Sequence, residues 1–338
     1  MRVFFGHFNE IVPVRKVSPD FGPHLVNGHG IAKLRCIFIW ALSLGFLSCL
    51  GNLAVPNPPV SGKGRIAALR QLSDYCPSLK NTPGDTAVYV LNSGEPGANL
   101  LLAAGTHGNE TAGIHAAEFF VELARVEKGC VFVIPRLNNP GVASGSRLVP
   151  VDYQGQSDPE QYTPPEGITI YAGMEQRNID RSYPGTKHAG LAQKIALAVM
   201  NLLITENIEI AIDMHEAKPG SDLAWCIVSN PKNVSLAALA VLDLEEKGIR
   251  MHLDASPPNM DGLSHREWGN RTRAMAFLIE TVNPAQADTP LPDEINNPQY
   301  TLSRRSAIHL ETVRSLVSRC NEALSMPLVY SGIPDYSQ

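Results

Sequence analysis

Short apolar runs alternate with longer segments of helical periodicity along the chain beyond residue 80. The runs contain few polar residues, which is typical of strands buried on both faces of a sheet. The helical segments carry apolar residues three and four positions apart. The expected strands are 87–91, 99–104, 130–135, 208–214, 223–228 and 274–279, and the expected helices are 111–127, 188–204, 235–247 and 302–325. This alternation predicts an α/β fold with a mixed, mostly parallel twisted sheet and helices on both faces.

One apolar segment, 36–50, does not belong to this alternation. It carries no charge and follows Lys33 and Arg35. A membrane-spanning helix needs about 20 residues, whereas the apolar region of a signal peptide has about 7–15. We therefore expect a signal peptide or membrane anchor, and the weaker alternative is a buried core helix. The protein would then be periplasmic, extracellular or membrane-anchored, with possible membrane contact through this segment.

The same segment divides the chain into three expected parts. Residues 1–55 form an N-terminal extension, and the prolines that follow mark 56–62 as a linker. Residues 63–330 form one catalytic domain, long enough for a single large core. Within that domain, a polar stretch rich in proline and glycine spans 138–185. At about 45 residues it is longer than an ordinary connection, which indicates a functional role.

Composition excludes several classes of protein. The 338 residues are 44% hydrophobic and 18% charged, which argues against collagen-like, coiled-coil and wholly disordered chains. A net charge of −5 argues against a nucleic-acid partner, which would favour a basic surface. Six cysteines are too few for a disulfide scaffold. Four of them lie in the expected domain, where no spacing identifies a pair: Cys76, Cys130, Cys226 and Cys320.

Three of the expected strands end at side chains that bind metals. His107 and Glu110 lie in the turn after 99–104, and His215 and Glu280 follow two later strands. Ligands bind beyond the carboxyl ends of strands in such sheets. Two histidines and one glutamate are the ligands of a common catalytic zinc site, which keeps one position open for water. Each residue alone is weak support because strand-end histidines are often structural, but their common placement favours a metal site.

These residues resemble motifs of the zinc carboxypeptidase superfamily, in particular its succinylglutamate desuccinylase/aspartoacylase branch. The turn 105–110 reads Gly-Thr-His-Gly-Asn-Glu, and 213–215 reads Asp-Met-His. The segment 177–185 resembles the family's Asp-Leu-Asn-Arg-Asn-Phe-Pro sequence, and 135–140 resembles the Asn-Pro segment that precedes it. Together the motifs cover roughly residues 85–285, most of the expected domain.

The resemblance implies a zinc metallohydrolase that acts on carbon–nitrogen bonds. One Zn²⁺ per chain would be bound by His107, Glu110 and His215, with Glu280 as general base and acid. Arg181 matches the arginine that grips a substrate carboxylate or polarises the scissile carbonyl. The substrate would be a small peptide cleaved at its C-terminal bond or an N-acyl amino acid. The alternative is a non-catalytic, zinc-binding, membrane-anchored protein of the same fold.

Two features favour different substrates. The deacylase branch carries an additional β-rich C-terminal domain, whereas about 58 residues follow Glu280 here and their main feature is a helix. That difference, together with export, favours an open cleft for peptides. The amino-acid sequence of the turn 105–110 favours the deacylases.

The segment around Arg181 departs from the family. The family's asparagine before the arginine is Asp180, which is expected either to orient Arg181 or to favour a substrate with a cationic end. Asn178 or Arg177 is expected to take over the lost substrate contact, and Arg147 is another candidate cation.

Two residues beside the expected ligand His215 have supporting roles. Asp213 lies on the same face of its strand and is expected to receive the second N–H of a ligand. Glu216 is expected to support the site structurally.

Overall fold

The computed structural model describes residues 64–154, 173–256, 261–287 and 300–336, all within one compact unit, Asn57–Gln338. The expected extension 1–55, its apolar segment 36–50 and the linker 56–62 lie outside these residues. Within the described ranges no helix combines the length and the apolar character needed to cross a membrane. The four cysteines of the described part are buried and unpaired.

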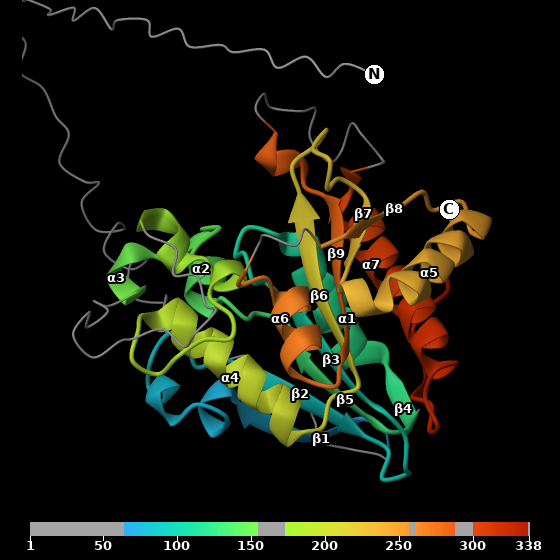
Figure 1. Cartoon of the computed structure of the whole chain (residues 1–338), viewed down its shortest axis with the longest axis horizontal. Helices are drawn as coiled ribbons and strands as arrows, with labels where there is room; N and C mark the ends of the chain where they lie inside the picture. Colours follow the sequence, from blue (N-terminus) through green and yellow to red (C-terminus); the bar gives the residue numbers. More distant parts are fainter. Residues whose placement is uncertain (1–63, 155–172, 257–260, 288–299, 337–338) are drawn as a thin grey trace, which may run out of the picture. The chain divides into compact units, whose positions relative to one another are not determined.

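One sheet of eight strands organises this unit, in the order β1-β2-β5-β3-β6-β9-β7-β8 (Figure 1). Parallel ladders join β5 to β3, β3 to β6, β6 to β9 and β7 to β8. Antiparallel ladders join β1 to β2, β2 to β5 and β7 to β9. The strands are β1 (Ile66–Gln71), β2 (Ala87–Asn92), β3 (Asn99–Ala104), β5 (Cys130–Ile134), β6 (Ile210–Ala217), β7 (Cys226–Ser229), β8 (His252–Ala255) and β9 (Met275–Val282). The predicted mixed sheet is confirmed.

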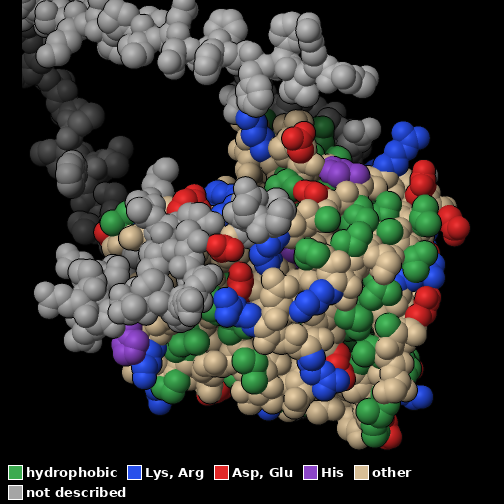
Figure 2. All heavy atoms as spheres, viewed as in Figure 1, with side chains coloured by type: hydrophobic (Ala, Val, Ile, Leu, Met, Phe, Trp, Pro, Cys, Tyr) green, Lys and Arg blue, Asp and Glu red, His purple; other side chains and the backbone are tan. Residues whose placement is uncertain are grey.

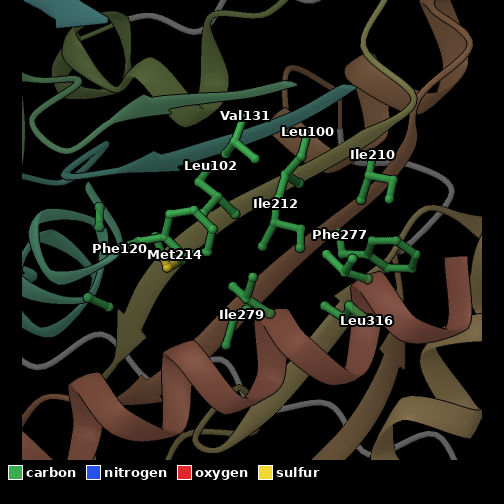
Figure 3. Close-up of a cluster of buried hydrophobic side chains, with 14 of the residues drawn as sticks. Leu100, Leu102, Phe120, Val131, Ile210, Ile212, Met214, Phe277, Ile279 and Leu316 are labelled. Carbon is green, nitrogen blue, oxygen red and sulfur yellow. The ribbon is translucent and has the colours of Figure 1, made fainter. Parts of the chain in front are cut away.

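Helices cover both faces of the sheet, as predicted, and each face has its own hydrophobic core. The core formed with α1, α5 and α7 contains Ile210, Ile212 and Met214 of β6. Figure 3 shows the side chains of β3, β6 and β9 meeting Phe120 of α1 and Leu316 of α7. The core on the opposite face contains Ala211, together with side chains of α4 and α6. The helices are α1 (Thr111–Leu123), α2 (Asn139–Ser144), α3 (Val151–Gln154), α4 (Leu191–Thr205), α5 (Val234–Glu246), α6 (Ser264–Arg271) and α7 (Leu302–Asn321).

The expected helix 111–127 ends earlier, at Leu123. Ala124 is extended, with φ −63° and ψ 143°, and β4 (Arg125–Lys128) follows directly. This strand pairs antiparallel with β10 (Val329–Ser331) near the C-terminus. The local apolar pattern continued the helix, but pairing with a segment some 200 residues away stabilises a strand instead. The strands β1 and β8 and the helix α6 were also not expected.

The strands that carry His215 and Glu280 are longer than expected. They pair in parallel register from Ile210 and Met275 up to Ala217 and Val282. His215 and Glu280 are therefore opposite each other inside the ladder, two residues before its end. Because β-strand side chains alternate between faces, Asp213 and His215 point away from the core that contains Met214.

Charged side chains of both signs are interspersed over the face of the molecule shown in Figure 2. Hydrophobic side chains gather on the side where α5 lies (Figures 1 and 2). The exposed residues of α5 include Leu239 and Leu242.

Candidate metal centre

Three buried side chains meet where β3 leads into α1 and where β6 approaches its end. His107 and Glu110 belong to the turn between β3 and α1, and His215 belongs to β6. His107 Nδ1 lies 2.8 Å from Glu110 Oε1, and His215 Nδ1 lies 3.1 Å from Glu110 Oε2. The two Nδ1 atoms are 3.2 Å apart. The three predicted ligands therefore converge on one point and form a group that could hold a metal ion.

The other nitrogen of each imidazole faces a side chain that orients the ring. His107 Nε2 donates to Asn178 Oδ1 at 3.0 Å. His215 Nε2 lies 2.9 Å from Asp213 Oδ2, as expected, and the other oxygen of Asp213 accepts from the hydroxyl of Thr106 at 2.9 Å. Histidine ligands in metal sites usually donate their second N–H in this way. The Nδ1 lone pairs are thereby directed toward the Glu110 carboxylate.

The charges of the cluster favour a bound cation. Burial alone would raise the pKa of Glu110, but the neighbouring His107 and His215 hold it well below its usual value. Burial alone would lower the pKa of His215, but Asp213 and Glu110 raise it well above its usual value. The negative charges of Glu110 and Asp213 thus favour positive charge beside the two imidazoles. The donor set of two imidazole nitrogens and one carboxylate fits zinc.

Glu280 lies beside His215 on the neighbouring strand β9. Its carboxyl group is almost completely buried, and Oε2 has no hydrogen-bond partner among the described residues. Burial raises the pKa of Glu280 well above its usual value, and the negative charge of Glu110 adds to this effect. The side chain can therefore hold a proton next to the ligand cluster.

The three arginines predicted for substrate contacts occupy different surroundings. Arg147 forms an ion pair with Glu110, while its side chain remains half-exposed at the edge of the cluster. Arg177 donates to the carbonyl of Val149 at 3.0 Å and so closes a loop of the main chain. Arg181 donates to the carbonyl of Asp180 at 2.6 Å. Arg147 contacts the cluster directly, and Arg181 contacts Asp180, which has an oxygen within 4.8 Å of a ring nitrogen of His215. The described contact of Arg177 serves the loop.

Asp180 and Asn178 contact different groups around the site: Asp180 contacts Arg181 and the start of α6, and Asn178 contacts His107. Asp180 is buried; its Oδ2 lies 3.4 Å from Arg181 Nη1, and its Oδ1 accepts from the backbone N–H of Ser264, the first residue of α6, at 2.7 Å. Burial alone would raise the pKa of Asp180, but the charges of His215 and Arg181 lower it. Of the two roles expected for Asp180, the structure provides the contact that orients Arg181. Asn178 lies against the ring of His107, and its expected contact with the substrate stays a prediction.

A second polar cluster, which sequence reasoning largely missed, lies on the opposite face of the sheet. Its centre is Glu216, whose carboxylate forms an ion pair with Arg305 of α7. The hydroxyl of Thr281 on β9 lies 3.4 Å from Glu216 Oε1 and 3.1 Å from His309 Nε2. The strand β6 therefore contributes His215 to the candidate metal cluster, which consists of His107, Glu110 and His215, and Glu216 to this second cluster. The charged residues within the otherwise apolar face of α7 were the available signal.

We expect His309 in this second cluster to make the fold sensitive to acid. Burial, followed by the charge of Arg305, lowers its pKa to about 3. An unfolded histidine has a pKa of about 6.5, so below that pH the unfolded chain binds a proton that the folded chain refuses. The stabilising contribution of neutral His309 is complete above about pH 6.5 and is lost as the pH falls toward 3.

We therefore expect the free energy of unfolding to decrease as the pH is lowered from about 7 to about 4, and His309→Gln to flatten this decrease. Urea unfolding of both proteins across that range measures the two slopes. Equal slopes would show that His309 does not carry the effect.

Comparisons with known proteins assign the region that holds this site. The family model of the succinylglutamate desuccinylase/aspartoacylase catalytic domain matches residues 96–282. A curated relative, the N-alpha-acetyl-L-2,4-diaminobutyric acid deacetylase of Halomonas elongata, is 28% identical over 165 residues, which are 48% of this chain and 38% of the relative. The matched region 96–282 includes every predicted ligand and substrate residue.

Two solved structures are similar to the described fold. The product-bound ectoine utilization protein EutE (DoeB) from Ruegeria pomeroyi has a TM-score of 0.50 and 16% identity, covering 75% of this chain and 64% of that one. A succinylglutamate desuccinylase from Silicibacter sp. has a TM-score of 0.48 and 16% identity, covering 69% of this chain and 60% of that one. The chain thus spans less than two thirds of the length of each of these relatives. The similarity to EutE (DoeB) supports the assignment of the fold and nothing further.

Proposed function

The chain belongs to the succinylglutamate desuccinylase/aspartoacylase family, and we propose that it is a zinc-dependent hydrolase that cleaves the amide bond of an N-acyl amino acid. The observation that carries this proposal is the convergence of His107, Glu110 and His215, with Glu280 on the adjacent strand. The named deacetylase relative supports an amide bond as the target.

The residues of the cluster have distinct parts in this reaction. His107, Glu110 and His215 would hold the zinc ion, and Asn178 and Asp213 would keep the two imidazoles in position. Zinc bound by these side chains would supply a water molecule of lowered pKa and polarise the amide carbonyl. The burial of all three ligands excludes bulk water from the donor atoms.

Glu280 would serve as the proton carrier. Its carboxylate would take the proton of the attacking water and then deliver it to the nitrogen of the leaving amine. A carrier works best when its pKa lies near the working pH, and burial moves the pKa of Glu280 upward in that direction.

Arg181 would bind the carboxylate of the substrate or the developing charge on its carbonyl oxygen. The side chain is only partly exposed, and its guanidinium is held by Asp180 through both a carbonyl and a carboxylate. Because Arg181 is already oriented, little side-chain freedom is lost when substrate binds.

We expect Arg181→Met to lower kcat/KM by about 10²–10³-fold, the range for removal of one donor to a reacting oxyanion. Steady-state kinetics with Arg177→Met as the matched control measure this effect, since the described contact of Arg177 is to Val149. Similar losses in the two variants would contradict the role given to Arg181.

The substrate class is tested with two panels. One contains N-acetylaspartate, N-succinylglutamate and N-acetyl-2,4-diaminobutyrate; the other contains short peptides with a free C-terminus. We expect the wild-type protein to release amine from members of the first panel. The Glu280→Gln protein serves as the negative control and should release none. Cleavage of peptides without cleavage of any acyl amino acid would favour a carboxypeptidase, and inactivity of a zinc-loaded protein on both would favour a non-catalytic zinc-binding protein.

A further inference from the structure

The buried ion pair between Glu216 and Arg305 lies on the face of the sheet opposite the metal cluster. The Glu216 side chain is completely inaccessible to solvent, and that of Arg305 is 1% exposed. Taking two charges out of water is costly, and a buried pair is weak support for stability by itself. Glu216 also contacts the turn that carries His107 and Glu110, which suggests that the ion pair has a role at the metal centre.

Glu216 contacts both Glu110 and the start of α1. Its backbone N–H donates to Glu110 Oε2 at 3.0 Å. Its carboxylate accepts from the backbone N–H of Ala112 at 3.0 Å. One residue of β6 therefore fixes both the ligand carboxylate and the main chain two residues beyond it, and His215 directly precedes it on the strand.

Thr281 of β9 and Asn283, which directly follows the strand, complete this attachment. Asn283 Nδ2 donates to the carbonyl of Asn109 at 2.9 Å and lies 3.4 Å from Glu216 Oε2. Thr281 Oγ1 lies 3.4 Å from Glu216 Oε1. The turn that carries His107 and Glu110 is thus joined to the two strands that carry His215 and Glu280.

Arg305 supplies the charge that allows this arrangement. The carboxylate of Glu110 accepts from the backbone N–H of Glu216 at 3.0 Å, so two residues with negatively charged side chains are held together and their like charges repel. Arg305 compensates the charge of Glu216 from α7, and its Nε donates to the carbonyl of Tyr300 at 2.9 Å. The guanidinium is therefore itself fixed from two directions.

We infer that Glu216 and Arg305 are positioning residues that set the affinity of the metal centre by holding the His107–Glu110 turn against β6. This inference rests on the proposed function, because it takes His107, Glu110 and His215 as zinc ligands. A pair that serves only the fold would change the stability of the protein and leave the affinity of the folded protein for zinc unchanged.

The test is a zinc titration of the full chain against a chromophoric chelator. Groups that orient metal ligands typically change metal affinity by about 10–100-fold when they are replaced, and we expect Glu216→Gln and Arg305→Met to raise the zinc Kd by that factor. Arg305→Lys keeps the charge and should restore part of the affinity. The matched control is Glu311→Gln, at another buried carboxylate of α7, which pairs with the half-exposed Lys247, and it should leave the zinc Kd within about 2-fold.

The outcomes separate this inference from the proposed function. A wild-type protein that binds no zinc would overturn the proposed function. A wild-type protein that binds zinc tightly, with Glu216→Gln and Arg305→Met binding equally well, would overturn the inference alone. Glu216→Gln preserves the shape of the side chain, so it decides the matter even if Arg305→Met does not fold.

Discussion

Replacing Glu280 with glutamine should lower kcat by about 10²–10⁴-fold, the usual contribution of a positioned general acid and base. Glutamine has nearly the same volume but cannot take up or release the proton. The zinc content should remain that of the wild-type protein, because Glu280 lies on β9 beside the proposed ligand His215 and is not one of the three converging side chains. Single-turnover kinetics together with metal analysis measure both quantities.

The control for this substitution is Glu267→Gln. Glu267 is also buried, but its carboxylate pairs with Arg271 on its own helix α6. We expect the control to keep its activity. Activity of Glu280→Gln within a few-fold of wild type would show that another group transfers the proton.

The second large effect is expected from His215→Ala, which removes one of the three converging donor atoms. Zinc sites keep three protein ligands in catalytic centres, so a site with two should release the ion during dialysis. When the ion is lost, activity should fall below detection, since zinc would activate the attacking water. Both are measured on dialysed protein and again after addition of zinc.

The control is His115→Ala, at a half-exposed histidine of α1 whose ring nitrogen lies 3.7 Å from Glu118. This variant should retain zinc and activity. A His215→Ala protein with full zinc content would mean that the ion is held elsewhere.

The convergence of the candidate ligands was predictable because most of its information is local. His107 and Glu110 are three residues apart in one turn, and His215 and Glu280 follow apolar runs that were recognised as strands, although both strands extend beyond them. The parallel register of β6 and β9 then brings His215 and Glu280 together without any further requirement. The fold class followed from the same alternation of strands and helices.

Contacts that depend on distant segments were not predictable from the pattern. The strand β4 exists because β10 pairs with it, and Arg305 acts across about 90 residues of sequence on Glu216. Asn178 was expected at the substrate because of its neighbours in the motif, and its contact with His107 at 3.0 Å joins residues 71 positions apart in the sequence. The export segment 36–50 and the division into three parts stay predictions.

The most direct test of the proposed zinc centre is the metal content of the purified full-length protein, measured by inductively coupled plasma mass spectrometry after exhaustive dialysis. Three buried ligands with oriented imidazoles predict about one zinc ion per chain. Less than about one ion per two chains, in protein that is folded and was never exposed to chelators, would contradict the assignment.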